Sequence, residues 1–245
     1  MIIRLLLSIS VFSFVKLNAQ PQFSGWLATF NTFKTGKKTS IHNDIQWRSS
    51  DKFQHTQTLL LRGGLNVHVN KQLTVTTGYA FIHNRRVVND ISGYVPEHRI
   101  WEQLLYNHKL AIGSHGKNIL VSHRFRLEQR FISKSIVQND ELNNDGSLYA
   151  NRFRYFIRNV FPLQQQPTFS KGLFAALQNE VFVNFGNTSN VNGKFFDQNR
   201  LYLAIGYRLH SSFDIEAGYM NQYVSGRGNA FTNNHVAQVA GYVRL

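Results

Sequence analysis

The segment Ser-His-Arg-Phe-Arg-Leu-Glu-Gln-Arg-Phe, residues 122–131, decides between the fold classes open to this chain. In a β-strand, successive side chains point to opposite faces of the sheet. One face of the segment is then ionic and the other mostly apolar, with Arg124, Arg126, Glu128 and Arg130 against Phe125, Leu127, Gln129 and Phe131. A helix, with 3.6 residues per turn, would spread the arginines around its circumference. The segment is therefore predicted to be a strand.

The same two-residue alternation recurs along most of the chain. We predict about eleven strands, at residues 23–33, 39–48, 56–69, 72–83, 97–110, 118–131, 148–161, 173–185, 196–209, 213–223 and 234–245. In a water-soluble sandwich the apolar faces would meet a core, whereas in a membrane barrel they meet lipid and the charged faces line a lumen.

The spacing of the connections favours the barrel. Short connections near Asn70, Gly113 and Ser211 alternate with long ones near Val88, Asn139, Asn190 and Gly228. Outer-membrane barrels show this alternation, because their periplasmic turns are short and their external loops long. We therefore predict an all-β fold, a single up-and-down antiparallel transmembrane β-barrel of 10–12 strands. Since bacterial barrels usually have an even number of strands, ten or twelve are expected.

Some connections and irregularities are also predicted. Residues 85–96 and the polar segment 133–147 are expected to form long loops. The alternation within 97–110 is uneven, which indicates a β-bulge, and the pair Gly63-Gly64 indicates a bend or bulge in its strand.

The N-terminus has the layout of a secretory signal peptide. Arg4 precedes an apolar run at residues 5–15, and the stretch closes with Leu17-Asn18-Ala19. We predict cleavage after Ala19, so that residues 1–19 are the signal and residues 20–245 form the barrel. The run is shorter than the ~20 apolar residues that a membrane-spanning helix needs. The predicted location is the bacterial outer membrane.

The chain carries a formal net charge of +14 and has no cysteine. A basic excess suits nucleic acid, an anionic lipid surface or anionic solutes, and export argues against nucleic acid. The predicted partners are outer-membrane lipid, including lipopolysaccharide, and a small anionic solute. Loop residues Arg85, Arg86 and Arg227 are candidates for the lipid contact. The oligomeric state is left open.

Several phrases of the sequence resemble the domain-of-unknown-function family 2490, whose members are expected to be bacterial outer-membrane β-barrels. They are Arg124-Phe-Arg-Leu-Glu-Gln-Arg130, Asn151-Arg-Phe-Arg154, Glu180-Val-Phe-Val-Asn184, Asn199-Arg-Leu-Tyr202 with Gly206-Tyr207, and Gly218-Tyr-Met-Asn-Gln222 before Asn234-His235. The resemblance implies a fold and a location. It carries no established activity, and none of these phrases is a catalytic signature.

The main candidate site is the charged face of the predicted barrel. Its members are Arg124, Arg126, Glu128, Arg130, Arg152, Arg154, Arg158, Glu180, Arg200, Arg208 and Glu216. On adjacent strands these side chains could interleave as Arg–carboxylate pairs that fill a small barrel. Because arginines exceed acids in the set, a small anion-favouring pore is the functional interpretation. Structural packing and a pore both remain open.

An enzyme and a soluble binding protein are the alternatives. Barrel enzymes that act on lipids use a Ser or His with an acidic partner, and here Ser122-His123 precedes Glu128. Adjacent residues of a strand point to opposite faces, so Ser122 and His123 cannot pair directly. The histidines lack metal-ligand spacing and no phosphate-binding loop occurs, so no cofactor or metal is predicted. The third hypothesis is a secreted soluble β-barrel that binds an anionic or apolar ligand.

Aromatic residues are predicted to form girdles at the two membrane interfaces, where amphipathic rings sit well. The candidates are Trp26, Trp47, Trp101, Tyr79, Tyr207, Tyr219 and Tyr242.

Overall fold

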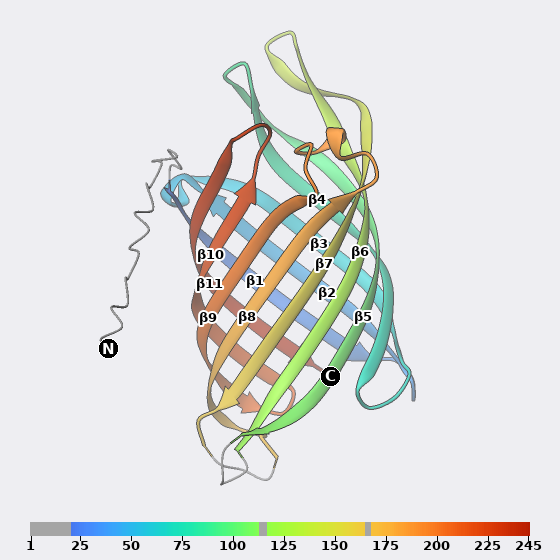
Figure 1. Ribbon diagram of the computed structural model, residues 1–245, viewed down its shortest axis with the longest axis vertical. Helices are drawn as coiled ribbons and strands as arrows, with labels where there is room; N and C mark the ends of the chain where they lie inside the picture. Colours follow the sequence, from blue (N-terminus) through green and yellow to red (C-terminus); the bar gives the residue numbers. More distant parts are fainter. Residues whose placement is uncertain (1–20, 113–116, 165–167) are drawn as a thin grey trace, which may run out of the picture.

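The computed structural model describes residues 21–112, 117–164 and 168–245. Within them, eleven strands form one closed barrel (Figure 1). The strands are β1 Pro21–Lys34, β2 Thr39–Ser50, β3 His55–His68, β4 Leu73–Val88, β5 Ile91–Ile112, β6 Lys117–Gln138, β7 Glu141–Pro162, β8 Gly172–Phe185, β9 Phe196–His210, β10 Phe213–Ser225 and β11 Phe231–Arg244. The predicted signal peptide, residues 1–19, lies outside the described residues. No helix in the described ranges is long and apolar enough to cross a bilayer.

Each strand pairs with its sequence neighbours in antiparallel fashion, and β1 and β11 close the ring in parallel. Strand directions alternate along the chain, so with an odd number the first and last strands run the same way. Over residues 21–112, 117–164 and 168–245 the structure thus confirms the all-β barrel within the range of 10–12 strands. The preference for ten or twelve was wrong, because the parallel pair from Pro21↔Asn233 to Thr32↔Arg244 accommodates an eleventh strand.

Two predicted long loops are strand extensions instead. Strand β4 continues to Val88 and β5 begins at Ile91, so residues 85–96 are paired except at Asn89 and Asp90. Both turn residues have positive φ, 49° and 64°, as in the two-residue turns whose twist matches that of the flanking strands. A like turn joins β6 and β7 within 133–147. These hairpins project beyond the barrel at the upper end in Figure 1.

The predicted irregularity within 97–110 is absent, because β5 keeps an unbroken register with both of its neighbours there. The alternation looks uneven because Trp101 points inward, where it is only 1% exposed, while Glu102 points outward. On the outer face Glu102 accepts a hydrogen bond from Gln129 at 3.1 Å. The register is also unbroken at Gly63–Gly64.

Two glycines make room for the inward tryptophan. A Cβ on Gly64 would lie 2.8 Å from the indole of Trp101, and one on Gly78 would lie 2.6 Å from it and 2.2 Å from the carbonyl oxygen of Gly63. Gly63 itself faces outward and has open space beside it. The glycines of β3 and β4 therefore permit a close approach of the Trp101 ring rather than a bend.

The barrel wall is apolar outside and largely polar inside. Outward residues with large exposed apolar side chains include Leu27, Ile41, Ile45, Leu61, Ile100, Leu104, Phe125, Phe153, Leu177, Leu203, Ile205 and Val239. Among the buried side chains of the described residues, more are polar or charged than apolar. A water-soluble barrel shows the reverse arrangement.

The aromatic residues divide between the two faces. Tyr79, Tyr207 and Tyr219 are exposed on the outer wall, and their place in an interfacial girdle stays a prediction. The prediction is wrong for Trp26, Trp101 and Tyr242. The two tryptophans are buried inside, and the hydroxyl of Tyr242 donates to the inward Glu216 at 2.7 Å. Each of the three rings occupies a position in its strand whose side chain points into the lumen.

Gly78→Ala is expected to lower the free energy of unfolding by about 1–3 kcal/mol, because a buried methyl must displace backbone and an indole. The matched control is Gly63→Ala, one strand away, which has open space and should change stability by no more than about 0.5 kcal/mol. Urea unfolding of the two variants in lipid vesicles measures both. Equal stabilities would contradict the close packing around Trp101.

Candidate anion-binding cup in the lumen

A buried carboxylate on β6 organises the centre of the lumen. Glu128 is 1% exposed and accepts from Arg152 Nη2 and Arg154 Nη1, each at 2.6 Å. Arg99 Nη1 lies 3.6 Å away on the other side. Strand β6 lies between β5 and β7 and its even-numbered residues point inward, so Glu128 meets guanidinium groups from both neighbouring strands. Short charge-assisted bonds of this kind are the strong ones in proteins.

Glu180 on β8 forms the second node. Its Oε1 accepts from Arg154 Nη2 at 2.7 Å and from Arg124 Nη2 at 2.6 Å, while Arg200 lies 3.9 Å from Oε2. Arg154 therefore bridges Glu128 and Glu180. One continuous ion-pair network runs across β5 to β9.

Other residues of the predicted set lie apart from these nodes. Near the opposite end of the barrel, Arg158 pairs with Glu216, and Arg208 pairs with Asp214 at 2.7 Å. Arg126 makes no carboxylate contact among the described residues and instead donates to Gln103 at 2.6 and 3.0 Å.

The prediction omitted several charged residues that belong to the same interior. Glu97 accepts from Arg99 at 2.6 Å and from Arg130 at 2.7 Å, and Arg62 pairs with Asp44 at 2.8 Å. Arg152 also reaches Asp197 at 3.0 Å. The two-residue alternation around Asp44 and Arg48 could have identified Asp44 as an inward residue of β2. Glu97 was not identified because it follows a segment that was expected to be a loop.

Closely packed side chains fill the lumen at the level of the network. Trp101, Arg126 and Glu128 are each 1% exposed, and Tyr202 is fully buried. An apolar cluster of Trp26, Phe174, Ala176, Tyr202, Ala204, Met220 and Val236 lies on the adjoining wall. Both features favour a packed lumen over a wide water channel at this level.

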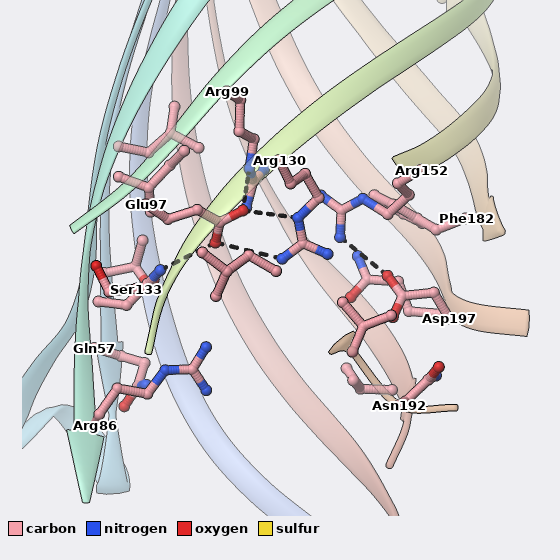
Figure 2. A pocket seen from close by; sticks show the side chains of 18 of the residues that line it. Gln57, Arg86, Glu97, Arg99, Arg130, Ser133, Arg152, Phe182, Asn192 and Asp197 are labelled. Carbon is pink, nitrogen blue, oxygen red and sulfur yellow. Dashed lines mark hydrogen bonds and ion pairs between the residues drawn. The ribbon is translucent and has the colours of Figure 1, made fainter. Parts of the chain in front are cut away.

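Beyond the packed layer, the lumen opens into a cup of about 640 Å³ on the side of the long hairpins. Figure 2 shows how Glu97, Arg99 and Arg130 meet on one wall and Arg152 and Asp197 on the other. The described residues that line the cup include two carboxylates, Glu97 and Asp197, and ten arginines: Arg48, Arg62, Arg85, Arg86, Arg99, Arg130, Arg152, Arg154, Arg200 and Arg227. Further carboxylates reach some of these arginines from below, but the cup retains a positive excess.

The proposed catalytic constellation is not assembled. Ser122 points inward and donates to Asn107 at 2.6 Å. His123 points outward, where it meets the Tyr155 hydroxyl at 2.9 Å and His108 at 3.2 Å. Glu128 is committed to arginines. Among residues 21–112, 117–164 and 168–245, no group of three His, Asp or Glu side chains forms a metal site.

Glu128→Gln is expected to lower the free energy of unfolding by about 3–5 kcal/mol, because it leaves buried guanidinium groups without their counter-charge. The control is Lys134→Gln. Its ion pair with Asp145 is about half exposed, so its loss should cost no more than about 1 kcal/mol. Urea unfolding in lipid vesicles compares the two, and a Glu128→Gln variant as stable as the control would contradict the central role of this node.

The sequence was compared with known families and proteins. The family model described as Protein of unknown function (DUF2490) matches residues 23–233, from β1 into β11. No curated protein matches the chain. The match covers the strands that carry the ion-pair network and confirms the resemblance noted in the sequence. This eleven-stranded barrel therefore belongs to the DUF2490 family of proteins of unknown function.

Proposed function

We propose that this protein is a bacterial outer-membrane barrel that binds an anionic solute in its arginine-lined cup. Residues 1–19 direct export and residues 20–245 form the barrel. The location is supported by the exposed apolar outer wall and the ionic interior, the distribution expected when lipid surrounds the strands. Closure of the ring also suits a membrane, because it leaves no strand edge unpaired in hydrocarbon.

The main support for this proposal is the excess of arginines over carboxylates in the cup. Guanidinium groups present forked donors that match carboxylate and phosphate oxygens. A concave site with an excess of one sign of charge also focuses its field and raises the local concentration of the opposite ion. Arg85, Arg86 and Arg227 lie at the mouth, where they would attract an anion toward the interior. The cup opens on the hairpin side, which in such barrels faces the exterior.

An anion-favouring pore is the second candidate, since the same positive lining would select anions. The nearly unexposed side chains below the cup weigh against it. A lipid-modifying enzyme has less support, because His123 points outward while Ser122 and Glu128 point into the lumen. A soluble ligand-binding barrel would have to keep its apolar outer wall in water.

Planar-bilayer recordings separate binding from conduction. Purified protein inserted into a bilayer is expected to show no sustained unitary conductance, because Arg126, Glu128 and Trp101 fill the lumen. Steady anion-selective openings would support the pore and contradict a packed lumen.

Calorimetry tests the cup directly. Detergent-solubilised protein is expected to bind inorganic pyrophosphate, and the affinity should fall when NaCl is raised from 0.05 to 0.5 M, because added salt screens the partly open cup. The cation spermidine is the control and should not bind. Failure of the native protein to bind pyrophosphate at low salt, or equal binding of spermidine, would overturn the proposal.

A further inference from the structure

The ring of one tryptophan at the side of the cup contacts the guanidinium groups of two arginines. Trp26 of β1 points inward and is 7% exposed. The guanidinium carbon of Arg48, on β2, lies 4.0 Å from the centroid of the Trp26 ring, and that of Arg200, on β9, lies 5.0 Å from it. Both arginines line the cup. Each guanidinium group thus lies within the range over which the electron-rich face of an aromatic ring attracts a cation.

Arg48 has no ion pair among the described residues, and Arg200 has only a long one, to Glu180. Among the described residues, Arg48 donates only to the amide oxygen of Gln46, at 2.6 Å, and its Nε is buried without a hydrogen-bond partner. Arg200 lies 3.9 Å from Glu180. That carboxylate already accepts shorter bonds from Arg124 and Arg154.

The other interior arginines of the cup differ in this respect. Arg62, Arg99, Arg130, Arg152 and Arg154 each have a carboxylate oxygen within 3.0 Å. The excess positive charge of the inner cup is therefore concentrated at Arg48 and Arg200.

Arg126 provides the comparison. It also lacks a carboxylate partner among the described residues, but it donates twice to Gln103 and stacks on Trp101 at 4.6 Å. It does not line the cup, and its 1% exposure keeps it out of reach of a solute. An anion that enters the cup can reach Arg48 and Arg200 but not Arg126.

We propose that Arg48 and Arg200, held over Trp26, form the subsite that binds a phosphoryl group of a small free solute. A phosphoryl dianion carries the charge that two guanidinium groups without a short ion pair need, and it has enough oxygens to accept from both forks. The cup volume of about 640 Å³ limits the solute to a small molecule. This inference rests on the proposed function and locates its ligand.

The double variant Arg48→Gln/Arg200→Gln tests the subsite by calorimetry with inorganic pyrophosphate. Its affinity is expected to fall about tenfold or more, because charge-assisted hydrogen bonds are lost. The matched control is Arg85→Gln/Arg86→Gln, which removes two charges from the mouth of the same cup. The control should lose no more than about threefold, since only long-range attraction changes.

The outcomes separate the two proposals. If native protein binds pyrophosphate and the double variant binds it equally well, the subsite is wrong while the anion-binding cup stands. If native protein does not bind, the proposed function itself is overturned. Phosphatidic acid in the micelles should leave pyrophosphate affinity unchanged, and competition would assign the subsite to a lipid headgroup instead of a free solute.

Unfolding in urea provides a second readout. Arg48 has no ion pair among the described residues and that of Arg200 is long. Removal of the two like charges should therefore leave the double variant at least as stable as the native protein, because their mutual repulsion disappears. A clear loss of stability would mean that the two arginines hold the barrel together, and would overturn the subsite. The single variants Arg48→Gln and Arg200→Gln carry the same expectations if the double variant does not refold.

Discussion

The structure depends on the pairing of buried carboxylates with arginines from neighbouring strands. Glu128 and Glu180 share Arg154, and each also binds a second arginine. A charge placed inside a narrow barrel loses most of its contact with water, so it is tolerated only when counter-charges and hydrogen bonds replace the solvent. The network is therefore satisfied only when these strands lie in this order and at this register. The lumen of this barrel takes the place of a hydrophobic core.

The packing of the lumen changes along the barrel axis. At mid-height, charged groups are matched and large rings such as Trp101 and Tyr202 occupy the remaining space. Toward the hairpin end the lumen has many more arginines than carboxylates. Some guanidinium groups therefore lack a close counter-charge, and a cavity opens there. The same chemistry thus gives a packed layer where the charges balance and an arginine-rich cavity where they do not. The rings of Trp26 and Phe182 support the unmatched guanidinium groups.

Strand alternation was sufficient to predict the fold and the charged face. It could not identify the ion-pair partners, since Arg124 and Glu180 are 56 residues apart and meet only through the stagger of the closed sheet. The long hairpins were missed because strands exposed to solvent on both faces have the composition of loops. In β5 the apolar Trp101 points into the lumen and the charged Glu102 points outward, which is the opposite of the pattern expected for these residue types. The cup was not predictable because its depth depends on where each strand begins and which side chains cross the lumen.

The parallel pairing of β1 with β11 has a consequence for how the barrel is made. Every other strand contact joins neighbours in the chain and can form as soon as both strands exist. The β1–β11 pair instead joins the two ends of the described barrel, residues 21–32 with 233–244. Because these segments are the most distant in the chain, their pairing has the largest cost in chain entropy. Until the final strand arrives, both β1 and β10 keep an open edge that can capture other chains. We therefore expect the pairing of β1 with β11 to form last, and it removes both open edges of the sheet at once.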